Sequence, residues 1–274
     1  EVDEDQVAVV TPEEVVVLDR DGNPVQPRPL NVDFLRERAS KDGWQTYMEK
    51  EINEQPRAIL DTLAGRLDER GRLTLDELRI PETLLRSCDR IVFIACGTAA
   101  YAGMVARYAV ERWTRIPCQV ELAHEFRYRD PVVSDNTLVI AISQSGETMD
   151  TIMAVRHARE EGAKVIAVVN TPGSTIAREA DAVLLTHAGP EIAVASTKAF
   201  TAQIVALYIL GLYLAQIRGN KYTEEIEGYL EELGQIPDKM EDVLHSGDLV
   251  RAEATAMAGA DSVIYLGRGV GYPI

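Results

Sequence analysis

A polar hexapeptide, SQSGET at residues 143–148, separates an apolar run from a segment with helical spacing. Its side chains offer three hydroxyl groups and an amide, and its glycine allows a backbone N–H group to approach a ligand closely. After a parallel strand, such residues stand where helix N-termini present unpaired N–H groups and a positive dipole end. This combination suits a phosphate group. We therefore predict that an anion binds at Ser143, Ser145 and Thr148.

Helix capping is the competing interpretation of the hexapeptide. Serine and threonine favour helix N-caps, so Ser145 or Thr148 could serve only the following helix. Two further predicted strand ends carry similar residues: the tripeptide CGT at 96–98 and the loop AGPEIAVASTKAF at 188–200. In that loop, Ser196 before a helix is typical of an ordinary N-cap. Agreement among three loops at one sheet edge nevertheless favours a binding site.

Other chemistries find less support in the sequence. No GxxxxGK[ST] motif is present, and the glycines of GRGVGYPI (267–274) lack the following helix and acid of a dinucleotide site. The QSG segment is not a GxSxG elbow, so a serine nucleophile is unsupported. Cys96, at a strand end, is interpreted as a small buried residue rather than a nucleophile. Arg127 and Arg129 are predicted to form solvated or interface salt bridges.

Composition narrows the class of protein. The 274 residues are 46% hydrophobic and 26% charged, which is ordinary for a soluble globular protein. A formal net charge of −16 argues against nucleic acid or an anionic membrane surface as a partner. Three cysteines without CxxC spacing and four histidines without an HExxH pattern indicate neither a metal site nor a disulfide framework.

One stretch is long and apolar enough to suggest a membrane span. Residues 199–217 are interrupted by Thr201, Gln203 and Gln216, so we predict a buried core helix instead. The N-terminal EVDEDQ lacks the basic region of a secretory signal. Together with the cysteine pattern, these features predict a cytoplasmic protein.

The loops described above need a sheet to position them. Five short β-rich runs lie at 90–97, 118–122, 137–143, 164–170 and 181–187. They are apolar throughout, and helix-like segments separate most of them, which is typical of parallel strands covered on both faces. We predict a three-layer α/β domain with a doubly wound, five-stranded parallel sheet.

Shorter elements flank this domain. The sequence predicts strands at 7–10 and 14–18, and helix over 44–66 with a break at Pro56. The tail, 261–274, repeats the plan of the domain's own start: an aspartate, an apolar strand and a glycine. We predict that it is the first strand of a second α/β domain and that the chain is a fragment, because a strand without its crossover would leave an unpaired edge.

Six segments carry a resemblance to a known family: KEINEQPRAI (50–59), ACGTAAYAG (95–103), EFRYRDP (125–131), SQSGETMDT (143–151), GPEIAVASTKAF (189–200) and LGRGVGYPI (266–274). In this order they resemble the glutamine–fructose-6-phosphate aminotransferase family. Its members have a glutaminase domain with a cysteine nucleophile, then two sugar isomerase (SIS) domains of flavodoxin-like fold. The resemblance implies four parts: the end of a glutaminase domain at 1–40, a connecting helix and linker at 41–87, a first SIS domain at 88–225, and inter-domain helices with the start of a second SIS domain at 226–274.

The resemblance also implies which residues contact the substrate. The sugar's phosphate would lie against Ser143, Gln144, Ser145, Thr148, Thr98 and Ala99, while the backbone of Val194 and the hydroxyl of Ser196 would face the sugar. Ala99 stands where many members have serine, so that a hydroxyl contact is lost and only the backbone N–H group remains. Ala100 likewise replaces a commonly aromatic residue.

By the same resemblance, the intact protein makes glucosamine 6-phosphate and glutamate from fructose 6-phosphate and glutamine, for amino-sugar synthesis. The chain begins with Glu1 rather than the family's cysteine, and the isomerase histidine and lysine would lie beyond Ile274. We therefore expect no catalytic residue, metal or cofactor here, and no activity from this chain alone. The expected partners are a small sugar phosphate and a second copy bound through the SIS domain, with no nucleic acid or membrane.

Two other functions stay open at this point. A non-catalytic SIS module could sense a sugar phosphate, but residues 1–87 show no basic recognition helix of the kind that such a regulator uses. A dimerisation scaffold could use the apolar helix at 196–218 as its interface, and this is compatible with the aminotransferase interpretation.

Overall fold

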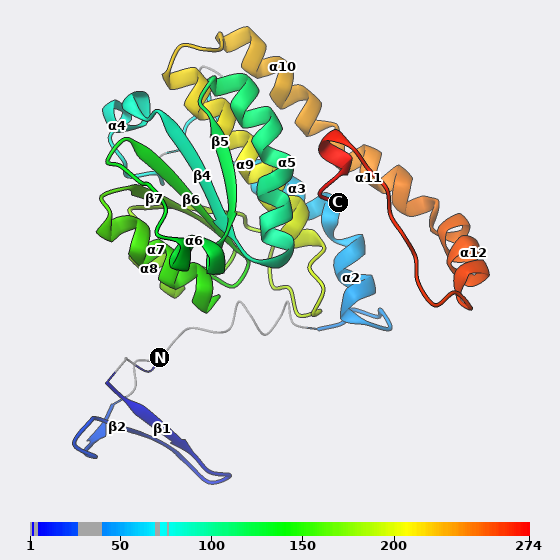
Figure 1. Ribbon diagram of the computed structural model, residues 1–274. Helices are drawn as coiled ribbons and strands as arrows, with labels where there is room; N and C mark the ends of the chain where they lie inside the picture. The colour runs from blue at the N-terminus through cyan, green and yellow to red at the C-terminus, as the bar shows by residue number, and fades with distance from the viewer. Residues whose placement is uncertain (1, 3–4, 27–39, 69–71, 76) are drawn as a thin grey trace. The chain divides into compact units, whose positions relative to one another are not determined.

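The computed structural model describes residues 2, 5–26, 40–68, 72–75 and 77–274. The chain divides into two compact units, Glu1–Ser40 and Lys41–Ile274, which are described separately. Figure 1 shows the order of the elements along each unit. Residues 27–39 of the expected first segment lie outside the described residues.

The first unit contains a small antiparallel sheet with the strand order β1-β2-β3. Its strands are β1 (Val7–Val10), β2 (Val15–Leu18) and β3 (Pro24–Val25). Asp19 closes the turn between β2 and β3, because its Oδ1 accepts the N–H groups of Asp21 at 2.9 Å and Asn23 at 2.8 Å. The two strands predicted near the N-terminus are therefore present to within one residue.

The second unit is built on a five-stranded parallel sheet with the order β5-β4-β6-β7-β8. Its strands are β4 (Arg90–Ala95), β5 (Cys118–Leu122), β6 (Thr137–Ser143), β7 (Lys164–Val169) and β8 (Ala182–Leu185). The predicted doubly wound parallel sheet is confirmed. The order of the strands reverses between β4 and β6, which is the position where open α/β sheets bind ligands.

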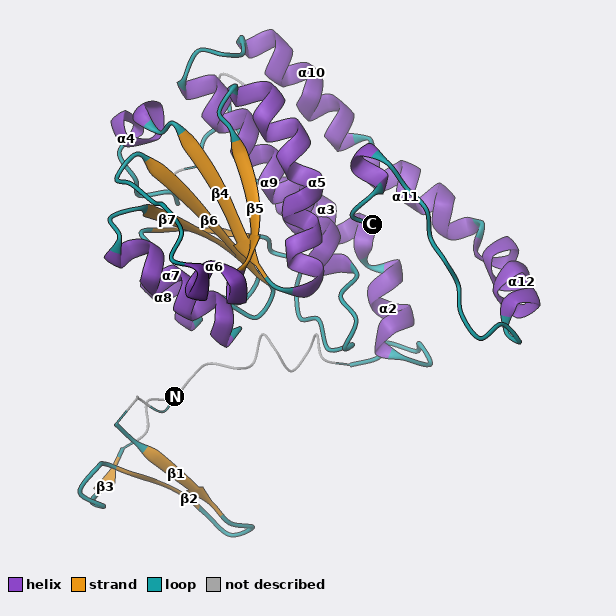
Figure 2. Cartoon of the chain, in the orientation of Figure 1, coloured by secondary structure: helices purple, strands orange, loops and turns teal. Residues whose placement is uncertain are grey.

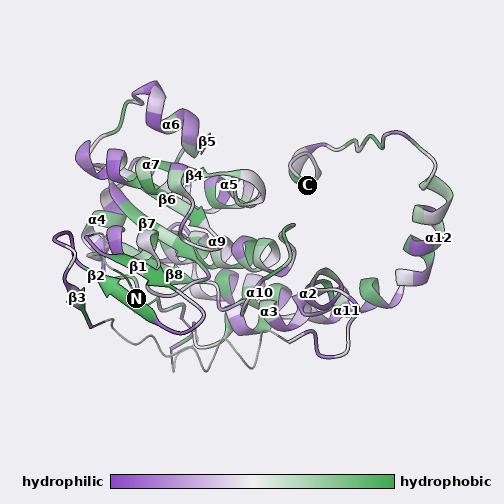
Figure 3. Ribbon diagram, turned by 90° about the horizontal axis from the view of Figure 1, so that it is seen from below, coloured by the Kyte–Doolittle hydropathy of each residue, from purple (hydrophilic) through white to green (hydrophobic). Residues whose placement is uncertain are grey.

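Helices cover both faces of this sheet, so the domain has three layers (Figure 2). One face carries α3 (Gln55–Leu63), α5 (Gly97–Thr114) and α9 (Lys198–Ile217). The other carries α6 (Ala123–Arg129), α7 (Met149–Glu160) and α8 (Thr175–Glu179). Along β4, Phe93 packs into the first core and Ile94 into the second, because successive strand residues face opposite sides. Burial on both faces is why these strands are continuously apolar (Figure 3).

Helix α9 lies in the core of this unit. Within the described part of the chain it is the one helix long and apolar enough to cross a membrane, with a mean hydropathy of 1.7 over an 18-residue window, of which 67% is buried. It packs closely on α5 at Gly211, where an added Cβ would come within 2.8 Å of Val110 Cγ2. The prediction that this stretch forms a buried core helix is thus confirmed.

The segment before the sheet forms several short helices and not a single one. Helix α2 (Tyr47–Asn53) ends at Glu54, α3 begins at Gln55 with Pro56 in its first turn, and α4 (Glu82–Ser87) follows. The break predicted at Pro56 is confirmed, since proline fits the first turn of a helix but not its interior. Neither α4 nor α6 was predicted as a helix.

The predicted strand at the C-terminus is wrong. Three helices, α10 (Thr223–Gly234), α11 (Ile236–His245) and α12 (Gly247–Met257), precede an extended and exposed segment at 263–268, and a short 3-10 helix follows at Gly269–Gly271. None of the described strands pairs with this segment. An apolar sequence becomes a strand only when a neighbour accepts its backbone hydrogen bonds.

Candidate phosphate-binding pocket

A pocket of about 220 Å³ opens at the carboxyl ends of β4 and β6. The eight residues predicted to contact a substrate all line it: Thr98, Ala99, Ser143, Gln144, Ser145, Thr148, Val194 and Ser196. The sheet therefore brings three loops together, one after β4, one after β6 and one after β8. Because parallel strands end at the same edge, predicted residues as far apart as Thr98 and Ser196, 98 positions in sequence, share one cavity.

The hexapeptide at the end of β6 keeps two of its three hydroxyl hydrogens available for a ligand, because one hydrogen is used between Ser143 and Thr148. Ser143 is buried, and its Oγ accepts the N–H group of Gly146 at 3.0 Å and lies 3.2 Å from the Thr148 hydroxyl. Ser145 Oγ accepts the N–H group of Glu147 at 3.2 Å. An oxygen that accepts a backbone hydrogen bond still has its own O–H to donate. The loop thus offers hydroxyl donors to an anion.

The structure does not support capping as the role of the hexapeptide. Thr148 is the N-cap residue of α7, yet its side chain makes no capping hydrogen bond. Thr197 is in the same position before α9, and its side chain does not cap that helix either. There Glu191 acts instead, accepting the N–H groups of Thr197 at 2.9 Å and Ala199 at 3.0 Å. The expected ordinary cap at Ser196 is wrong, because the Ser196 hydroxyl donates to Glu191 Oε2 at 2.9 Å.

Gly146 has a packing role that the sequence did not indicate. Its φ is +68°, in the left-handed region that favours glycine, and an added Cβ would lie 2.0 Å from Ser174 Oγ. Its carbonyl accepts the N–H group of Ile176 at 3.0 Å, and Glu147 Oε1 accepts that of Thr175 at 2.7 Å. The glycine therefore lets the hexapeptide pack against the loop that precedes α8.

Helix α5 also begins at the pocket. Gly97, its first residue, has a φ of +55°, and Thr98 and Ala99 complete the start of its first turn. The first N–H groups of a helix have no partner within that helix, and they carry the positive end of its dipole. Ala99 can offer only its backbone N–H group here. Residues at the N-termini of α5 and α7 therefore line the same cavity from helices on opposite faces of the sheet.

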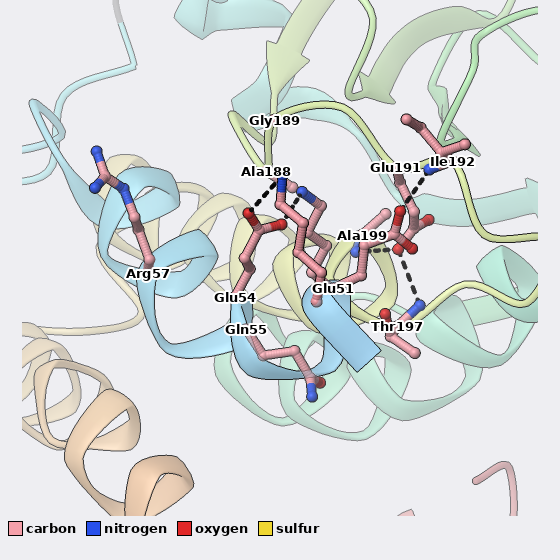
Figure 4. A network of polar contacts seen from close by, with 12 residues as sticks. Glu51, Glu54, Gln55, Arg57, Ala188, Gly189, Glu191, Ile192, Thr197 and Ala199 are labelled. Atoms are coloured by element: carbon pink, nitrogen blue, oxygen red, sulfur yellow. Dashed lines mark hydrogen bonds and ion pairs between the residues drawn. The ribbon is translucent and has the colours of Figure 1, made fainter. Parts of the chain in front are cut away.

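The loop after β8 forms the remaining wall of the pocket. Val194 is fully exposed at its tip, and Ala193 and Ser196 line the cavity beside it. Two carboxylates hold this loop: Glu191 from within it and Glu51 from α2 (Figure 4). Motif analysis missed Glu51 as a site residue, because no local spacing connects it to a loop 141 residues away.

The pocket is lined by neutral donors rather than cations. Among the described residues that line it there is no lysine, arginine or histidine, and their one carboxylate, Glu191, is occupied by the hydrogen bonds described above. Lys198 lies near the loop, but it is buried and its Nζ pairs with Glu54 at 2.7 Å. Two lining residues outside the predicted set, Cys96 and the buried Gln203, add a thiol and an amide.

The fold also groups three potential metal ligands that sequence spacing does not reveal. The side-chain donor atoms of Cys96, His124 and Asp150 lie within 4.8 Å of one another. They come from the end of β4, from α6 and from the first turn of α7. The predicted absence of a metal stays a prediction.

The salt-bridge role predicted for Arg129 is confirmed, since it pairs with Glu121 at 2.7 Å.

Residues 84–213 match the family model for the SIS domain. Curated relatives extend the likeness to nearly the whole chain. The glutamine–fructose-6-phosphate aminotransferase (isomerizing) of Corynebacterium glutamicum is 58% identical over 98% of this chain, which corresponds to 43% of that protein. The protein of the same name from Mycobacterium tuberculosis is 51% identical, over 100% of this chain and 45% of its own length. This chain thus spans less than half the length of these relatives.

Solved structures agree with this likeness. The C-terminal domain of glucosamine-fructose-6-phosphate aminotransferase from Francisella tularensis superposes with a TM-score of 0.81 at 40% identity, over 86% of this chain and 66% of that one. A putative phosphosugar isomerase from Clostridium difficile has a TM-score of 0.62 at 19% identity, over 77% of this chain and 57% of that one, which shows a shared fold.

Proposed function

We propose that the pocket of this chain, which belongs to the glutamine–fructose-6-phosphate aminotransferase family, binds the phosphate group of a hexose phosphate. The observation that carries this proposal is the meeting of two helix N-termini and a hydroxyl-rich loop at the point where the strand order reverses. Backbone N–H groups at a helix N-terminus bind phosphate readily, and here α5 and α7 supply them from two sides.

The phosphate contacts belong to the loops after β4 and β6. Ser145 donates its O–H group, and so does whichever of Ser143 and Thr148 is the acceptor in the hydrogen bond between them. Gln144 donates its amide, and Thr98 and Ala99 contribute donors at the start of α5. Val194 and Ser196 face the sugar ring from the loop after β8. Neutral donors suffice because the two helix dipoles supply the positive potential that the lining lacks.

For the intact protein we propose amino transfer from glutamine to fructose 6-phosphate, with glucosamine 6-phosphate and glutamate as products. This rests on the names of the relatives that the chain matches. The proposed parts are a glutaminase remnant at 1–40, a connecting segment at 41–87, a first SIS domain at 88–225 and inter-domain helices with the start of a second SIS domain at 226–274. Homodimerisation through the SIS domain, a cytoplasmic location and a role in amino-sugar synthesis belong to the same proposal.

Sugar-phosphate sensing without catalysis is the second candidate function. One observation favours it for this chain alone: the carboxylate in the pocket lining is engaged as a helix cap, and the lining contains no histidine or lysine to act as a base. Both functions use the same pocket, so binding is the property to measure first.

The test is calorimetric titration of the chain with glucose 6-phosphate, and separately with inorganic phosphate and with glucose. We expect the double variant Ser145→Ala, Thr148→Ala to lose at least about tenfold in affinity, since one hydrogen bond to a charged group contributes about 1.5–3 kcal/mol. The matched control, Ser246→Ala with Thr255→Ala, removes two hydroxyls from the C-terminal helices and should leave affinity unchanged. Equal affinity in both double variants would contradict the proposed site.

A further inference from the structure

We infer that Glu51 is a positioning residue for the sugar-facing side of the pocket, acting through the backbone of the loop at 188–197. The inference rests on the proposed function for its ligand, but its structural part stands on contacts alone. Helix α2, which carries Glu51, lies outside the region that matches the SIS domain model, 84–213. A segment before the SIS domain therefore completes one wall of the SIS pocket.

The contacts of Glu51 are directed at the middle of the loop. Its side chain is 2% exposed, and Oε1 accepts the N–H groups of Ile192 at 2.6 Å and Ala193 at 3.1 Å. Oε2 lies 3.3 Å from the Ala193 N–H group as well. Within the part of the chain that the structure describes, no lysine or arginine pairs with this carboxylate. Burying an unpaired charge is costly, so the two N–H groups are what compensates for it.

Apolar packing does not hold this part of the loop. Ile192 is 45% exposed and Val194 is fully exposed. Val194 thus leaves its side chain in solvent and Ile192 exposes nearly half of its surface, and Ala193 itself has only a methyl group to bury. Hydrogen bonds to Glu51 are therefore the contacts that can fix its backbone, which lines the pocket.

Residues of α3 and of the junction between α2 and α3 also contact both ends of the loop. Before the loop, Thr62 Oγ1 donates to the Thr186 carbonyl at 2.5 Å. After it, Glu54 Oε2 pairs with Lys198 Nζ at 2.7 Å, a lysine only 3% exposed. Together with Glu51 in the middle, α2 and α3 contact the start, centre and end of the wall. Figure 4 shows Glu51 and Glu54 beside this loop. The conformation of the sugar-facing wall thus depends on α2 and α3.

The phosphate-facing side is held without Glu51. The carbonyl of Gln144 accepts the N–H group of Asn170 at 3.1 Å, and Glu147 accepts that of Thr175 at 2.7 Å. Neither hydrogen bond involves α2, and the Asn170 side chain contacts the loop after β8 only at its start, through the Gly189 carbonyl at 2.7 Å and the Ala188 N–H group at 2.8 Å. Loss of the Glu51 carboxylate should therefore loosen contacts to the sugar while contacts to phosphate persist.

The experiment compares Glu51→Gln and Glu51→Ala with the parent chain in two measurements. Hydrogen exchange is followed without ligand in peptides that cover 188–199, and calorimetry gives affinities for glucose 6-phosphate and for inorganic phosphate. We expect exchange at Ile192 and Ala193 to become at least about tenfold faster, because charge-assisted hydrogen bonds are lost. We expect glucose 6-phosphate affinity to fall about five- to tenfold and phosphate affinity to stay within about twofold. Glu227→Gln, an exposed glutamate on α10, is the matched control and should change neither.

Each outcome decides between the alternatives. Unchanged exchange in the loop of both variants overturns the positioning role. An equal loss of affinity for both ligands, with faster exchange throughout the domain, also overturns it, because Glu51 would then support the fold generally. If the parent chain binds no sugar phosphate while loop exchange responds to Glu51, the structural inference stands and the proposed function fails. The Gln variant keeps the size of the side chain, so it tests the role even if Glu51→Ala does not fold.

Discussion

At the scale of single residues, the three cysteines differ sharply in environment. Burial raises the pKa of the Cys88 thiol to about 11 and that of the Cys118 thiol to about 12. Cys96 is only partly buried and lines the pocket at the ends of β4 and β6. Because the thiolate is the reactive form of cysteine, the raised pKa values of Cys88 and Cys118, together with their burial, predict that these two thiols react less than the accessible Cys96.

We expect iodoacetamide at pH 7.5 to modify Cys96 while Cys88 and Cys118 stay unmodified in the folded chain. Saturating glucose 6-phosphate should slow the reaction, since the ligand and the reagent compete for one cavity. Peptide mass spectrometry over time measures both effects, and Cys96→Ala serves as the blank. Modification of Cys88 at a rate equal to that of Cys96 would contradict the burial that the structure shows.

At the scale of elements, an ion pair joins α7 to α8. Arg156 contacts both oxygens of Glu179, with Nε 2.8 Å from Oε2. The hydrogen bond from Arg156 is the main reason that the pKa of Glu179 lies below its usual value of 4.5. A carboxyl whose pKa is lower in the folded state stabilises the fold above pH 4.5, and this contribution is lost as pH falls through the lower, folded-state pKa.

We therefore expect Glu179→Gln to lower the free energy of unfolding by about 0.5–1 kcal/mol at pH 7, a modest effect because both partners are partly exposed. The difference from the parent chain should shrink towards zero as the pH falls below 4.5 and through the folded-state pKa. Urea unfolding at a series of pH values checks this. Glu231→Gln, on the exposed face of α10, is the control. If Glu179→Gln destabilises the chain equally at low pH, the destabilisation comes from lost packing and not from the lost charge.

At the scale of the whole molecule, the described chain separates into two units, and the pocket belongs entirely to the second. All the contacts that shape its walls, from Glu51 to Gln203, come from residues after 41. A domain that has its own hydrophobic core and contains all the contacts that shape its pocket folds without its neighbour.

We expect residues 41–274 alone to unfold within about 2 °C of the full chain and to bind inorganic phosphate with the same affinity. Thermal unfolding followed by circular dichroism, and titration with phosphate, measure the two properties. A fall in the midpoint of more than about 5 °C would show that the first unit stabilises the second.

The sequence by itself determined the sheet and where its loops lie. Strands that are covered on both faces must be apolar throughout, so β4 to β8 were visible as short runs, and the polar hexapeptide at the end of one of them marked the edge where the pocket lies. The interrupted apolar stretch in α9 was likewise enough to predict a core helix. In each case residues adjacent in the sequence were enough for the prediction, because every residue of a buried element must itself be compatible with burial.

Only the tertiary structure decided how the pocket is held together. Glu51 reaches a loop 141 residues away, Glu191 takes the capping role expected of Ser196, and Gly146 makes room for Ser174. The segment at 263–268 has the composition of a strand but forms none, since no neighbouring strand pairs with it. Hydrogen bonds and close contacts between distant residues depend on the packed arrangement of the helices and sheet, and no local spacing encodes that arrangement.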